Sequence, residues 1–301
     1  MPLKSIVQTQ ENTSAVLHPP VAHRAACLRQ RVARHGAGHE LGGQDFSAAD
    51  LSRLRLRSSD LTGCKLTAAD LSEGRFELSA FVNADLDAAD LSRAVLRGCS
   101  LAGASLVGAK LDGAVLEDAR LSGARMLRAS ARQACLRRCS ADASQWSHAD
   151  LGGADLSDAS LGKADLSHVS LVNGNLCRTN LESSDLHGAD LRQAYLGQAV
   201  MIDINLSGAD LRGADLRFAN LRGADLRDAD LREAMLTEAC LEGADLRGAQ
   251  WAGATFAGAS VKEAQLDGAL ASHLETGIQG RQSAGVMGIY NDSVMASKGS
   301  V

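Results

Sequence analysis

Aromatic side chains are scarce in this chain, because Phe, Trp and Tyr together make up 3% of its 301 residues. Ala, Leu, Gly, Asp and Ser dominate instead. Such a bias is expected when one small structural unit is repeated many times. The composition therefore argues against an ordinary packed globule.

The chain also lacks long apolar runs, paired cysteines and a strong charge excess. No run approaches 18 apolar residues, and residues 1–20 lack the charged start and apolar core of a secretory signal. We therefore expect neither a membrane span nor Sec export. The seven cysteines are scattered without a CxxC pair, which favours a reduced, cytoplasmic setting.

The formal net charge of -5 does not suggest direct binding to nucleic acid, which would require a concentrated basic face. Its distribution is uneven. Residues 41–268 hold 24 Lys and Arg against 32 Asp and Glu, a net charge of -8, whereas residues 1–40 carry +3.

A five-residue period runs through most of the chain. An apolar residue falls at every fifth position from Leu41 to Leu266, which gives 46 units without a slip in phase. All but two of these centres are large, the exceptions being Ala131 and Ala141. The residue two before the centre is usually Ala, and the residue between them is polar, most often Asp.

This period fits neither an α-helix nor a straight strand. In a helix, successive centres would rotate by about 140° and surround the axis. In a strand, an odd period would send successive centres to opposite faces. The regular alternative is a chain that turns a corner in each unit, so that every centre points to a common axis.

Units of the form AxLxx, and above all the run ADLRGADLRFANLRGADLRDADLRE from Ala209 to Glu233, resemble the pentapeptide-repeat family. The resemblance covers about three quarters of the chain. It implies an all-β fold, a right-handed quadrilateral parallel β-helix in which four units make one coil. The centre and the small residue two before it would point inward, and the other three residues outward.

Charges that recur at every fourth unit give a separate test of this coil. One such column reads Arg57, Glu77, Arg97, Glu117, Arg137, and another reads Arg53, Glu73, Arg93. Opposite charges on adjacent strands, about 4.8 Å apart, attract one another. These columns support the expected register.

The chain divides into four predicted segments. Residues 1–20 are predicted to be a disordered polar arm. In residues 21–40, Val21, Ala25, Leu28 and Val32 recur at helical spacing, so we expect an amphipathic helix and linker that cap the open end of the repeats. Residues 41–268 form the β-helix, and residues 269–301 a flexible tail.

No catalytic, metal-binding or cofactor-binding pattern emerges. The eight histidines are dispersed and are predicted to be solvated. Cys64, Cys99 and Cys139 occupy small inward positions and are predicted to fill the core. An acidic outward ladder of Asp190, Asp210 and Asp230 is bordered by arginines. Because a convex rod offers no water-excluding cleft for paired carboxylates, we do not expect an enzyme.

The repeat pattern does not require apolar residues at outward positions. Exposed apolar side chains of this kind are typical of protein interfaces. Scattered surface apolarity is the alternative explanation. The candidate residues lie on one side of the rod and around its next corner: Val95, Val115, Tyr195, Val200, Ile202, Phe218 and Met235.

Three functions remain open. The first is a non-catalytic protein-binding scaffold that uses this apolar patch. The second comes from the resemblance, since some members imitate duplex DNA, bind type II topoisomerases such as gyrase, and confer antibiotic resistance or self-protection. The third is a bacterial effector secreted by a non-Sec system, which residues 1–20 permit. The resemblance also leaves a homodimer through the C-terminal end open, although residues 269–301 are less apolar than such an interface needs.

Overall fold

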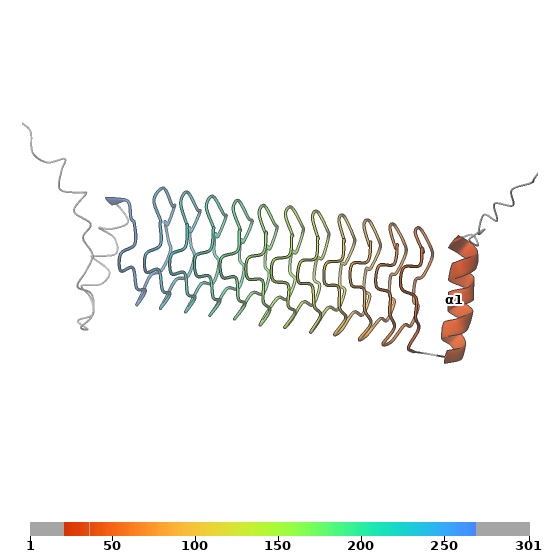
Figure 1. Ribbon diagram of the computed structural model, residues 1–301. Helices are drawn as coiled ribbons and strands as arrows, with labels where there is room; N and C mark the ends of the chain where they lie inside the picture. Colours follow the sequence, from red (N-terminus) through yellow and green to blue (C-terminus); the bar gives the residue numbers. More distant parts are fainter. Residues whose placement is uncertain (1–20, 36, 269–301) are drawn as a thin grey trace, which may run out of the picture.

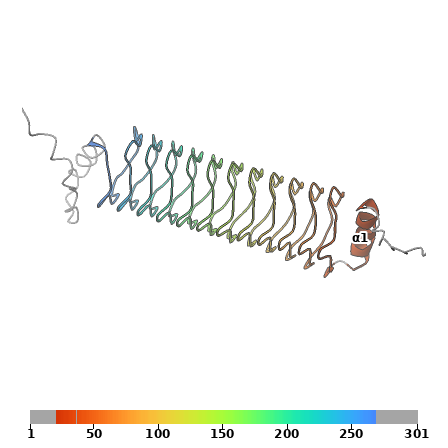
Figure 2. The same ribbon diagram turned by 45° about the horizontal axis from the view of Figure 1, so that its top comes forward.

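The computed structural model describes residues 21–35 and 37–268. They form a long rod of stacked coils, with helix α1 (Val21–His35) across the N-terminal end (Figure 1). A second view shows the same stack without a bend (Figure 2). The predicted right-handed quadrilateral β-helix with a helical N-terminal cap is confirmed. The predicted polar arm and C-terminal tail, and the roles suggested for them, lie outside the described residues.

The coils are held together by parallel β-bridges between residues 20 positions apart, from Ala37↔Arg57 to Asp245↔Gln265. This spacing confirms four units per coil. Each unit makes repeated backbone hydrogen bonds to the next coil. In one example the amide of Leu51 donates to the carbonyl of Asp70 at 2.7 Å, and the amide of Asp70 donates to the carbonyl of Ala49 at 2.9 Å. Backbone polar groups along the rod are thereby paired without long strands.

The interior is a ladder of apolar side chains. Centres such as Leu151 are fully buried, and the small residues two positions before a centre, such as Ala154, are buried with them. The three cysteines predicted to fill the core, Cys64, Cys99 and Cys139, are buried as well. Burial of each large centre stabilises the fold by about 1.5–3 kcal/mol before chain-entropy costs.

Helix α1 covers the first coil with its apolar face. Ala25, Leu28 and Val32 are buried against the rod. The guanidinium of Arg29 donates to the carbonyl of Ser52 at 3.1 Å and forms an ion pair with Asp50 at 2.9 Å. The helix therefore covers the apolar end of the rod, and Arg29 links it to the first coil.

The three outward residues of a unit occupy distinct places. We call them the bridge position, just before the centre, and the first and second turn positions, just after it. Every second turn position from Gly38 to Glu263 has a φ between 51° and 77°. Glycine adopts this left-handed region freely, whereas other residues pay about 1–2 kcal/mol. Many of these positions nevertheless carry side chains, which project from the corners of the rod.

Candidate interaction surface

One side of the rod carries the largest exposed apolar side chains. It consists of every fourth unit, from the unit centred on Leu56 to the unit centred on Phe256, and we call it the tyrosine side. Tyr195 and Met235 occupy bridge positions two coils apart and are 54% and 36% exposed. Phe218, at a second turn position between them, is 59% exposed. These three residues form one cluster, which we call the apolar cluster.

An ion pair between the nearly buried Asp215 and the half-exposed Arg217 lies within the apolar cluster. Asp215 bridges to both Tyr195 and Met235 and is only 9% exposed. The Nε and Nη2 atoms of Arg217 donate to its two carboxylate oxygens at 2.8 and 2.7 Å. This bidentate contact, together with a bond from the Arg217 amide, lowers the pKa of Asp215. The bidentate geometry fixes the Arg217 guanidinium on the Asp215 carboxylate between the bridge column and Phe218.

Phe218 is unusual because it is a large aromatic residue at a position where φ is positive in every unit up to that of Glu263; its own φ is 62°. A bulky side chain in this region is strained. One other large apolar residue in the described ranges shares this geometry: Leu78, with a φ of 61° and 57% exposed. Leu78 occupies the same column of the tyrosine side, seven coils closer to α1.

Leu78 is not among the residues predicted from the sequence. The signal was present, since Leu78 is a large apolar residue two positions after a centre. Its side chain lies over the next coil at Gly98, where a β-carbon would come within 2.8 Å of Leu78 Cδ2. The glycine thus leaves space for the leucine to lie flat at the corner.

The other predicted apolar residues do not join the apolar cluster. Val95 and Val115 bridge to each other on the tyrosine side, but Tyr195 lies four coils beyond Val115. Val200 and Ile202 are partly buried on the following side. The seven candidates therefore form one compact group and two separate pairs.

Between Leu78 and Phe218, the second turn column of the tyrosine side carries alternating charges. Arg138 makes a bidentate contact with Asp118, with distances of 2.8 and 2.9 Å. Arg178 makes the same contact with Asp158, at 2.6 and 2.7 Å. These bonds lower the pKa of both aspartates and raise the pKa of both arginines. We call these four residues the corner ladder.

The predicted acidic ladder lies on the preceding side and is not a free acidic surface. Arg192 lies 2.7 Å from Asp190 and 3.7 Å from Asp210, so it links two coils. Arg212 does the same for Asp210 and Asp230, at 2.6 and 3.6 Å. The result is a zigzag in which each carboxylate has a guanidinium partner.

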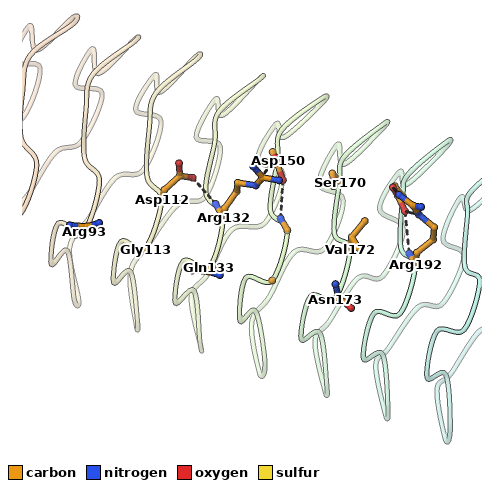
Figure 3. A pocket seen from close by; sticks show the side chains of 13 residues that line it. Arg93, Asp112, Gly113, Arg132, Gln133, Asp150, Ser170, Val172, Asn173 and Arg192 are labelled. Carbon is orange, nitrogen blue, oxygen red and sulfur yellow. Dashed lines mark hydrogen bonds and ion pairs between the residues drawn. The ribbon is translucent and has the colours of Figure 1, made fainter.

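A shallow groove of about 860 Å³ crosses the middle of that same side. It forms where Gly113, Gly152 and Gly153 present no side chain, and Figure 3 shows polar side chains around it. The ion pair between Arg132 and Asp150, at 3.1 Å, spans part of its wall. Asp150 also accepts a bond from the amide of Gly152 at 3.0 Å, so its carboxylate is engaged within the wall.

The prediction that all histidines are solvated is wrong for His39, which is 5% exposed because it occupies an inward position two residues before the centre Leu41. The view that the histidines are dispersed also fails. His148 and His168 stack with ring centroids 5.0 Å apart, and His187 lies 5.2 Å from His168. The three rings come from successive coils.

In the described ranges, no group of three or more His, Cys, Asp or Glu side chains is arranged to hold a metal ion.

No helix in the described part of the chain is both long and apolar enough to cross a bilayer. The structure therefore gives no candidate transmembrane helix in residues 21–35 and 37–268.

Comparison with known proteins gives one clear family match. A family model described as Pentapeptide repeats matches in overlapping segments between residues 41 and 270. No curated protein sequence matches the chain.

Solved structures similar to this chain include those of HetL and of a QnrB1 variant. HetL from the cyanobacterium Nostoc sp. strain PCC 7120, a pentapeptide repeat protein involved in heterocyst differentiation regulation, is 29% identical, with 78% of this chain and 94% of HetL covered and a TM-score of 0.40. A variant of QnrB1, a plasmid-mediated fluoroquinolone resistance protein, is 21% identical, with 80% and 95% covered and a TM-score of 0.46.

Proposed function

Because the chain belongs to the pentapeptide-repeat family, we propose that it is a non-catalytic scaffold that binds another protein through the outer surface of the rod, with the apolar cluster as its anchor. The observation that carries this proposal is the exposure of Phe218 in a strained backbone conformation. The repeat itself does not require a phenylalanine there, since Gly fills many equivalent positions. A large apolar side chain that stays exposed where the repeat does not need it is typical of a binding surface.

The surroundings of Phe218 suit a binding anchor. Tyr195 and Met235 add two more exposed groups, and aromatic residues and methionine are enriched in protein interfaces. The pair formed by Asp215 and Arg217 is already satisfied, so covering it would leave no new unpaired charge. The cluster thus combines apolar area with a rigid, preorganised base.

The proposal is tested by affinity capture with purified full-length protein as bait. Tyr195→Asp and Met235→Asp place charges in the apolar cluster and should each abolish capture of the specific partner. Phe218→Asn should weaken it at least about 10-fold, because an interface anchor is lost while Asn tolerates the backbone conformation. Gln133→Asn changes a second turn position on another side and serves as the matched control. Unchanged capture by all three cluster variants would reject the apolar cluster as the anchor.

A further inference from the structure

We propose that the tyrosine side binds a second copy of this chain, lying side by side and antiparallel, in a register that places Leu78 opposite Phe218. This inference rests on the proposed function and names the partner of the same surface. It follows from the order of side chains along the three outward columns of that side.

In the proposed dimer the two copies are related by a twofold axis. This axis lies in the contact plane and is perpendicular to both rods. Under this symmetry each outward column of one copy faces the same column of the other copy in reverse order. Coils of the two copies also repeat at the same distance of about 4.8 Å. If one pair of facing side chains is complementary in position, the pairs in the following coils are therefore aligned as well. A partner with a different repeat distance would lose this alignment along the contact.

The apolar groups match at both ends of the contact. Leu78 and Phe218, the two exposed large apolar residues with positive φ in the described ranges, face each other. In the bridge column of the same register, Val95 faces Tyr195. Twofold symmetry repeats each contact, so an apolar contact closes each end. The ends lie seven coils apart, or about 34 Å.

The corner ladder matches between these ends. In this register Asp118 faces Arg178, and Arg138 faces Asp158, so every facing pair in the ladder carries opposite charges. The existing contacts need not break, because each arginine uses only Nε and Nη2 for the aspartate of its own chain. A guanidinium has five N–H donors, which leaves others for the facing carboxylate.

The ladder also excludes neighbouring registers. A shift by one coil in one direction places Arg138 opposite its own copy and Asp118 opposite Asp158. A shift in the other direction places Arg138 opposite Arg178 and Asp158 opposite its own copy. Facing like charges repel, so both shifts are disfavoured.

The ion pairs beside the apolar ends have opposite polarity. Near Leu78, Arg75 at the bridge position contacts Glu77 at the first turn position, at 3.4 Å. Near Phe218 the order is reversed, with Asp215 at the bridge position and Arg217 at the first turn position. In the proposed register Arg75 faces Asp215 and Glu77 faces Arg217, so the ion pairs at the two ends of the contact are complementary.

The contact is small, which predicts a weak dimer. Eight coils of about 4.8 Å and three outward residues of about 3.3 Å each give a strip of roughly 400 Å² per copy. A stable interface usually buries about 800 Å² per partner. We therefore expect dimers that dissociate on dilution and a register fixed mainly by charge.

Sedimentation velocity over an about 100-fold range of concentration tests the dimer. The full-length chain should shift from monomer to dimer as its concentration rises. Leu78→Asn and Phe218→Asn should each raise the dissociation constant at least about 10-fold. The matched control Gln133→Asn should leave it unchanged. A chain that sediments as a monomer at every concentration would overturn the inference, as would dimerisation that is indifferent to both substitutions.

A cross-linking experiment tests the register. Leu78→Cys and Phe218→Cys chains are prepared separately with the four accessible cysteines replaced by serine, namely Cys27, Cys135, Cys177 and Cys240. A short bismaleimide should link the two chains only when they are mixed. Efficient linking of the Leu78→Cys chain to itself would show another arrangement and overturn the proposed one.

The two proposals fail separately. A monomeric chain that captures a different protein, and loses it when Phe218 is changed, overturns the dimer and leaves the scaffold proposal standing. A dimer weakened by Phe218→Asn and cross-linked in the expected register supports the inference whether or not another protein is captured.

Discussion

The indole Nε1 of Trp146 donates a hydrogen bond to Ser144 Oγ at 2.6 Å inside the rod. Ser144 in turn donates to the carbonyl of Ala141, the centre of the preceding unit. Trp146 is the largest fully buried side chain in the described residues, and it follows a centre that is small. A tryptophan therefore fits where leucine is usual, because the adjacent unit contributes less volume and a polar residue satisfies the indole.

Ser144→Ala should lower the free energy of unfolding by about 1–3 kcal/mol, because it leaves the buried indole N–H without its partner. Ser184→Ala is the matched control, since Ser184 occupies the same inward position and donates to the carbonyl of Leu181 at 2.7 Å, with no tryptophan beside it. The control should change stability little, because Ala is the usual residue there. Urea unfolding measures both, and equal losses would contradict this reading of Trp146.

Phe218→Asn should preserve or raise stability, by up to about 1 kcal/mol, because Asn tolerates the left-handed region and little burial is lost. Tyr195→Asn provides the comparison on the same side. Tyr195 does not have a positive φ, and Asn is a poorer residue than Tyr beside a β-bridge, so this variant should be less stable. If Phe218→Asn proved the more damaging of the two in thermal unfolding, the strain at Phe218 would not be as described.

The repeat and its register could be predicted from sequence, because the 46 centres keep one phase and the charges alternate in sign along the two columns that begin at Arg57 and Arg53. The ion pair between Arg53 and Glu73, at 3.0 Å, and that between Arg97 and Glu117, at 2.7 Å, realise the predicted columns. The ion pairs in both columns join residues of adjacent coils. A fixed period specifies directly which residues are neighbours in adjacent coils.

Several details were missed. Leu78 was not selected although, like Phe218, it is a large apolar residue two positions after a centre, and the positive φ that the two share is known only from the structure. The burial of His39 follows from its position two residues before the centre Leu41, so the period already contained that information. The stacking of His148 and His168 likewise follows from their separation by one full coil of sequence.

Acid should weaken the rod partly through Asp215. Its folded-state pKa is lowered by Arg217, so the carboxylate stays ionised to a lower pH in the folded chain than in the unfolded chain. The stabilisation is fully present above the ordinary pKa of about 3.9 and is lost as pH falls through the folded value. Between about pH 5.5 and pH 3, Asp215→Asn should lose less stability than the unmodified chain. Arg217→Gln should flatten the dependence similarly, and full acid sensitivity in both variants would refute this assignment.

Thiol labelling should divide the cysteines by position. Burial raises the pKa of Cys64 to about 11 and that of Cys99 and Cys139 to about 12, so the thiolates that react are rare and shielded. With iodoacetamide near neutral pH, the folded chain should be labelled at the exposed Cys27 and not at these three. In urea all should react, and mass spectrometry of peptides identifies them. Labelling of Cys99 or Cys139 before unfolding would indicate that the central coils open locally.

Gyrase supercoiling should be unaffected by this protein at concentrations equal to the enzyme, with or without a quinolone. A duplex carries one negative charge per about 1.7 Å, or roughly 32 over a rod of about 55 Å. The repeats carry a net charge of -8. Much of that acidity is also matched locally, as Arg227 lies 2.6 Å from Asp225 and Arg247 lies 2.6 Å from Asp245. A surface of paired charges presents a weak field to a site built for DNA. Inhibition of supercoiling, or protection from the quinolone, would show that the shape of the rod alone suffices for binding to gyrase. That result would favour the DNA-mimic function over the scaffold.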